Sequence, residues 1–158
     1  MITKLAFAAL VAAAPLAVAA PAAAQGHMLT VTNAWSRPAA AGTTGAGFFT
    51  ITNGAKAADA LVGAQSPLAQ KVEIHRSSLE GGVMRMSRQA RVPIPGAGGR
   101  ATFAPGGYHL MLIGLKKALA PGDSVPVTLS FASGARAKVD LKVGTGLAPA
   151  ADSAHHHH

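Results

Sequence analysis

The sequence predicts an all-β domain, folded as a β-sandwich or barrel and preceded by an export signal. Short apolar stretches recur along the chain and are separated by Gly, Pro, Asn and Asp at turn positions. Beyond the first 24 residues, no stretch of ten or more residues keeps the apolar spacing of a helix. The length of 158 residues, with 49% hydrophobic and 13% charged residues, fits one domain with its own core.

The first 24 residues are expected to be a secretory signal peptide. Lys4 supplies a positive charge, residues 5–20 form an uncharged Ala-rich stretch, and small residues precede Gln25. The alternative is a membrane anchor, but the stretch is shorter than the roughly 20 residues needed to span a bilayer. Cleavage after Ala24 would leave a domain over 25–143 and a flexible tail over 144–158. We therefore expect a periplasmic protein without a membrane span.

The first four strands are each bounded by turn-forming residues. Residues 29–34 alternate between apolar and polar side chains, as in a half-buried strand. A loop rich in Pro, Ala, Gly and Thr separates them from the strand 47–53, which ends at an Asn-Gly turn. Two short apolar strands follow at residues 60–64 and 71–75.

The second half of the chain continues the pattern. A longer strand is expected over 83–92, followed by a Pro/Gly loop over 93–99. Three turns, at residues 105–107, 121–123 and 133–134, separate the remaining strands. These strands are expected over residues 100–103, 108–113, 125–131 and 135–143, and the last two form a hairpin.

Composition excludes several functional classes. Without cysteine the chain cannot form disulfides, iron–sulfur clusters, cysteine zinc sites or a blue-copper centre. It has 14 Lys and Arg against 6 Asp and Glu, yet few aromatic residues, so nucleic-acid binding is not expected. No Ser-His-Asp order and no paired carboxylates stand out, so we do not expect an enzyme.

Histidine and methionine are the informative residues. His109 and Met111 are two apart on an expected strand, so both point to one face while Leu110 and Leu112 point into the core. Met84 and Met86 have the same spacing, and His75 precedes them. Imidazole together with thioether sulfur selects Cu(I) over Zn(II) or Mg(II). The alternative function is a secreted adhesion or assembly module whose His and Met fill a core.

These groupings resemble the signature of the periplasmic copper chaperone family PCuAC. His75 is followed by Met86 after ten residues, and then by His109 and Met111. The interval between Met86 and His109 is 22 residues, one more than the family pattern, and the extra residue fits the loop 93–99. The resemblance extends over about residues 29–143 and includes Ala34-Trp35-Ser36-Arg37, Val72-Glu73-Ile74-His75, Gly82-Val83-Met84-Arg85-Met86 and Pro105-Gly106-Gly107-Tyr108-His109-Leu110-Met111-Leu112.

The resemblance implies a cupredoxin-like Greek-key β-sandwich or barrel with a Cu(I) site at His75, Met86, His109 and Met111. It also implies delivery of copper for cytochrome c oxidase assembly, with a Sco-type protein or oxidase subunit II as acceptor. Met84 is a candidate auxiliary ligand, or a methionine at the rim of the site. Trp35 either covers the site or packs in the core. Arginines near the site either steer an acidic partner or form a solvated face: Arg76, Arg85, Arg88, Arg91 and Arg100.

The two ends of the mature chain are candidate Cu(II) sites. Cleavage after Ala24 leaves an α-amine, two amides and the third-position imidazole of His27, a four-nitrogen set that suits Cu(II). Cyclisation of Gln25 would remove that amine. The terminal run His155, His156, His157 and His158 is a second nitrogen-rich group, or a purification tag.

Overall fold

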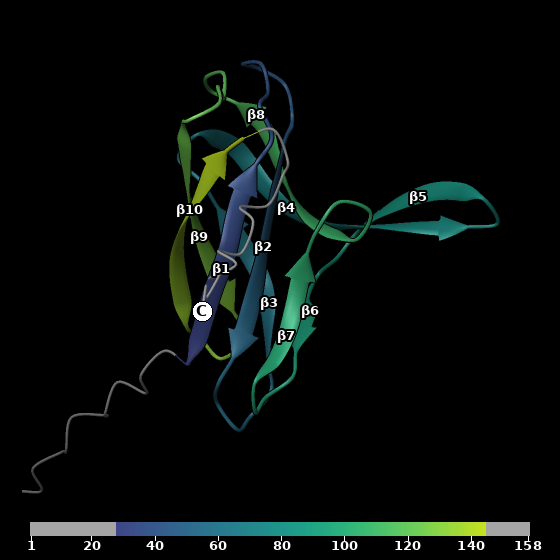
Figure 1. Cartoon of the computed structure of the whole chain (residues 1–158), viewed down its shortest axis with the longest axis vertical. Coiled ribbons are helices and arrows are strands. Elements are labelled where there is room, and N and C mark those ends of the chain that lie inside the picture. Colours follow the sequence, from purple (N-terminus) through teal and green to yellow (C-terminus); the bar gives the residue numbers. More distant parts are fainter. Residues whose placement is uncertain (1–27, 145–158) are drawn as a thin grey trace, which may run out of the picture.

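The structure is a computed structural model that describes residues 28–144, and it is built from ten β-strands (Figure 1). No helix occurs between residues 28 and 144, so this part of the chain has no helix long and apolar enough to cross a membrane. The strands are β1 (Leu29–Ser36), β2 (Gly45–Asn53), β3 (Asp59–Gln65), β4 (Ala69–Glu80), β5 (Val83–Arg88), β6 (Val92–Ile94), β7 (Gly99–Phe103), β8 (Tyr108–Leu115), β9 (Ser124–Phe131) and β10 (Arg136–Val143). The all-β prediction is confirmed.

All ten strands belong to one mixed sheet that folds back on itself. The strand order is β5-β4-β8-β7-β2-β1-β10-β9-β3-β6, with β8 also pairing with β2. β3 and β4 stand far apart in this order, yet they contact each other. One face of the sheet therefore encloses a single core, and the other, which we call the outer face, lies on the outside.

Alternation along strands such as β8 and β2 separates the core from the outer face. Leu110 and Leu112 of β8 are fully buried, and Ile74 of β4 lies opposite Leu110. On β2, Phe49 and Ile51 are buried in the same cluster. Burying about 20 such apolar side chains is the main favourable contribution to folding. The predicted inward direction of Leu110 and Leu112 is confirmed.

The prediction of one long strand over residues 83–92 is wrong. Residues 83–88 form β5 at one end of the sheet, and residues 92–94 form β6 at the other end. β5 is exposed throughout, whereas Val92 and Ile94 are buried. The loop predicted over residues 93–99 also begins later, because residues 93 and 94 belong to β6. Pro93 can lie in β6 because this is an edge strand, where its missing N–H costs no ladder hydrogen bond.

β4 is longer than the five residues predicted, and its second half leaves the body of the domain. Figure 1 shows the end of β4 and the whole of β5 standing out as a hairpin. Gly81 and Gly82, both with positive φ, form its tip. We call residues 77–88 the β4–β5 arm.

A β-bulge in β1 decides the position of the only tryptophan. The register against β2 shifts between Thr32 and Trp35, where Asn33 adopts a φ of 53°. Asn tolerates this left-handed conformation better than most residues. The extra residue reverses the alternation, so that Trp35 lies opposite Phe48 on the outer face while Ser36 turns inward.

Candidate metal centre

The predicted ligands come from three neighbouring strands and share the outer face. In the β4–β8 ladder His75 lies opposite His109, and Glu73 lies opposite Met111. In the β4–β5 ladder Met86 lies opposite Ser77, two residues beyond His75. Directly opposed residues point to the same side of a sheet. The fold therefore gathers His75, Met86, His109 and Met111 on one surface, although they come from three separate strands.

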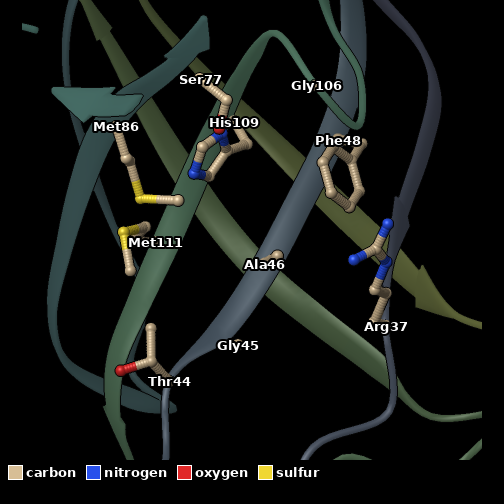
Figure 2. A pocket seen from close by; sticks show the side chains of 10 residues that line it. All are labelled: Arg37, Thr44, Gly45, Ala46, Phe48, Ser77, Met86, Gly106, His109 and Met111. Atoms are coloured by element: carbon tan, nitrogen blue, oxygen red, sulfur yellow. The ribbon is translucent and has the colours of Figure 1, made fainter. Parts of the chain in front are cut away.

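Three of the four predicted ligands line one open cavity of about 270 Å³. Met86, His109 and Met111 form one side, and Figure 2 shows a ring nitrogen of His109 pointing toward the two sulfur atoms. His109 is only 7% exposed. Met86 is 55% exposed, so it does not fill a core.

His75 lies beside this cavity but does not line it. Its ring centroid is 6.1 Å from that of His109, with the two rings tilted by 42°. Its side chain is 16% exposed and turns toward Glu73. The structure thus brings Met86, His109 and Met111 into one cavity and leaves His75 as their immediate neighbour.

Hydrogen bonds select one free nitrogen on each histidine. The Nδ1–H of His109 donates to the Gly107 carbonyl at 3.1 Å, which leaves Nε2 with its lone pair. The Nε2–H of His75 donates to Glu73 Oε2 at 2.9 Å, which leaves Nδ1 with its lone pair. That Nδ1 is buried and has no hydrogen-bond partner among residues 28–144. Both rings are therefore held as hydrogen-bond donors on one side and available as metal ligands on the other.

Glu73 is the acidic residue of this surface, and sequence reasoning did not assign it a role. Hydrogen bonding from Lys71, whose Nζ lies 2.7 Å from Oε1, is the main cause that lowers the pKa of Glu73 to about 2. The hydrogen bond from His75 and the charge of Arg88, 3.7 Å away, lower the pKa further. The carboxylate is thus ionised at neutral pH and fixes the His75 ring. Its position two residues before His75 on the same strand is the signal that would have found it.

Aromatic and cationic side chains form the side of the cavity away from the sulfur atoms. Phe48 is buried, with its ring centroid 4.6 Å from Trp35 and 6.5 Å from His109. The Arg37 guanidinium lies 5.3 Å from the Phe48 ring centroid. Trp35 packs on the outer face behind Phe48 and does not line the cavity. Sequence reasoning left the place of Trp35 open and missed Phe48 and Arg37.

The remaining candidate residues lie away from the cavity. Met84 is 58% exposed, does not line the cavity, and faces Leu79 one step farther out on the β4–β5 arm. Arg85 pairs with Glu80 at 3.2 Å, and Arg76 stacks over Tyr108.

His27 and the terminal run at 155–158 lie outside the described residues, as do the predicted signal peptide and the tail beyond residue 144.

Comparison with solved structures defines the class of fold. Apo-DR1885 from Deinococcus radiodurans is 31% identical with a TM-score of 0.55, over 90% of this chain and 98% of that one. CuI-DR1885 from the same organism is 30% identical with a TM-score of 0.58, over 79% and 85%. A copper-bound PCuAC domain from PmoF2 shares the fold, with a TM-score of 0.62 at 24% identity over 75% and 93%. The domain therefore has the all-β, cupredoxin-like fold of PCuAC domains.

Comparison of sequences defines the family. Residues 29–143 match the family described as "Putative lipoprotein LpqE-like", and the chain belongs to it. "Putative lipoprotein Lxx21020" of Leifsonia xyli subsp. xyli (strain CTCB07) is 34% identical over 122 residues, which is 75% of this chain and 71% of that protein. The family description speaks of lipoproteins, whereas this sequence contains no cysteine to carry a lipid.

Proposed function

We propose that this protein is an exported copper chaperone that binds Cu(I) through Met86, His109 and Met111, with His75 as the fourth ligand. The observation that carries the proposal is the cavity in which two thioether sulfur atoms face a ring nitrogen of a buried histidine, whose Nδ1 is hydrogen-bonded to the Gly107 carbonyl. Neutral sulfur and imidazole ligands together favour Cu(I) over harder divalent cations. Similarity of about 30% in sequence to CuI-DR1885 supports the same assignment.

The position of Met86 argues against the competing function. If the methionines were core residues of an adhesion module, they would be buried among apolar side chains. Met86 and Met84 are instead 55% and 58% exposed, on a strand that projects from the domain. An exposed thioether beside a histidine is suited to exchange with a second protein.

Transfer would proceed by ligand exchange and not by catalysis. Because the set contains no thiolate, a cysteine-containing acceptor offers Cu(I) stronger ligands, and copper can move to it without changing its oxidation state. The open cavity lets an incoming ligand reach the metal before the last methionine leaves. We propose the periplasm as the compartment, cytochrome c oxidase assembly as the process, and a Sco-type protein or oxidase subunit II as the acceptor.

Anaerobic titration with Cu(I) against a chromophoric chelator tests the proposal. The wild type should compete for one Cu(I) per chain, and His109→Ala or Met111→Leu should lose that competition. Met84→Leu is the matched control, because this methionine lies on the same arm but outside the cavity. If the wild type never competes with the chelator, the proposed function is wrong.

A further inference from the structure

The cavity is much larger than the ion proposed for it. Its volume is about 270 Å³, whereas a single water molecule occupies roughly 30 Å³ in the liquid. The candidate ligands occupy one side only. Figure 2 shows the other side, where Arg37 faces the ligands across the small residues Gly45 and Ala46. The cavity therefore has room for a second group beside the metal.

The chemistry of this second side selects an anion. Arg37 has no carboxylate within ion-pair distance in residues 28–144, and no acidic residue lines the cavity. Its guanidinium is exposed to solvent but positioned by the Phe48 ring. Thr44 and Ser77 add hydroxyl groups. Glu73, which adjoins the site through His75, already pairs with Lys71 and Arg88. With Cu(I) bound to neutral ligands, the cavity lining itself would therefore carry two positive charges and no negative one.

On the basis of the proposed Cu(I) site, we propose that Arg37 forms a subsite for the carboxylate of the thiol ligand that removes copper from this protein. The guanidinium fork binds a carboxylate in a bidentate manner. The sulfur of the same ligand then reaches the metal as a thiolate, its proton passing to solvent, and displaces a methionine thioether. Copper stays Cu(I) throughout, so no electron is transferred.

Two sources offer this ligand chemistry, and the experiment separates them. One is a small thiol that carries its own carboxylate. The other is a cysteine in an acceptor protein with an acidic residue nearby. The first arm compares 3-mercaptopropionate with its neutral amide, and the second compares a Cys-x-x-Cys peptide flanked by Asp with the same peptide flanked by Asn.

The measurement is the rate of Cu(I) transfer from the loaded full chain, compared at equal thiolate concentration. The wild type should transfer about three- to tenfold faster to the carboxylate-bearing member of at least one pair. Arg37→Gln should bring that ratio close to one, and Arg37→Lys should keep part of it because a point charge remains without the fork. Raising the salt concentration should shrink the preference.

Arg85→Gln is the matched control, since Arg85 lies on the same arm as Met86 but on the opposite face of the strand. It should leave the preference unchanged. The inference is overturned if the wild type shows no preference in either arm, if Arg37→Gln retains it, or if Arg85→Gln abolishes it equally. A wild type that binds no Cu(I) contradicts the proposed function instead, and equilibrium affinities of all variants distinguish these failures.

Discussion

Glu73 offers the sharpest test of whether His75 is a copper ligand. Its carboxylate accepts the Nε2–H of His75 at 2.9 Å and leaves the buried Nδ1 without a partner. Carboxylates that orient a ligating histidine typically contribute about 10- to 100-fold to metal affinity. Glu73→Ala should therefore weaken Cu(I) binding by about this factor. Glu73→Gln should cost less, because the amide oxygen still accepts the hydrogen bond.

In the Glu73→Ala variant, the neighbouring positive charges would weaken Cu(I) binding further, in addition to the effect of losing the fixed orientation of the His75 ring. Lys71 lies 2.7 Å and Arg88 3.7 Å from the Glu73 carboxylate. Without that carboxylate, both cations remain beside a site that must accept another cation. The neutral Gln variant shares this electrostatic effect and keeps the hydrogen bond, so comparing it with the Ala variant separates the two contributions.

The assay is anaerobic competition against a chromophoric Cu(I) chelator, with circular dichroism to verify the fold. Glu80→Ala is the control, because it removes an acidic residue of the arm that pairs with Arg85 and not with a histidine. Wild-type affinity in Glu73→Ala would mean that His75 does not bind copper with this orientation. A gain in affinity would mean that Glu73 holds His75 away from the cavity.

Three further predictions concern metal selectivity, stability and the chain ends. Methionine methyl NMR should show large shifts of the two cavity methionines with anaerobic Cu(I) and almost none with Zn(II), because thioether sulfur prefers the softer ion; shifts with zinc would contradict the ligand set. Burial raises the pKa of Asp59, but hydrogen bonds from Ser133 and Ala60 and the charge of Arg91 together lower it below its usual 3.8. Because the pKa of Asp59 is lower in the folded state, its contribution to the free energy of unfolding is complete above about pH 4 and is lost as the pH falls through the folded-state pKa. Asp59→Asn should therefore lower the free energy of unfolding by about 1 kcal/mol at pH 7 and by less in acid, as measured by urea unfolding. A loss of stability that does not change with pH would refute this. Cu(II) titration followed by EPR should change in His27→Ala or after removal of residues 155–158, and if neither alters binding, both terminal sites are wrong.

Side-chain alternation was the most informative property of the sequence. His109 and Met111 are separated by one buried leucine, and the structure places them on the outer face as the spacing predicted. Met84 and Met86 likewise share one face of β5. These predictions depended only on the two-residue period of a strand, which holds whatever the strand pairs with.

Properties that depend on tertiary pairing could not be predicted. The sequence predicts one strand over residues 83–92, but the strand breaks at residues 89–91. β5 pairs with β4, and β6 pairs with β3 at the opposite edge. Nothing local to the sequence marks where the chain changes partners. The direction of Trp35 depends on a bulge at Asn33, and a residue that tolerates positive φ permits such a bulge without requiring it.

The placement of the cavity on the outer face has a consequence for protein engineering. Met86, Met84 and Arg37 are all exposed. The two methionines lie on β5, which contributes no side chain to the core, and Arg37 follows the end of β1. Randomised libraries at these positions should therefore lose few clones to unfolding, because surface substitutions usually change stability by about 0.5 kcal/mol or less. His109, at 7% exposure, is the exception. The scaffold is thus suited to selection for new soft-metal specificities, with the strands as a fixed frame and the outer face as the variable surface.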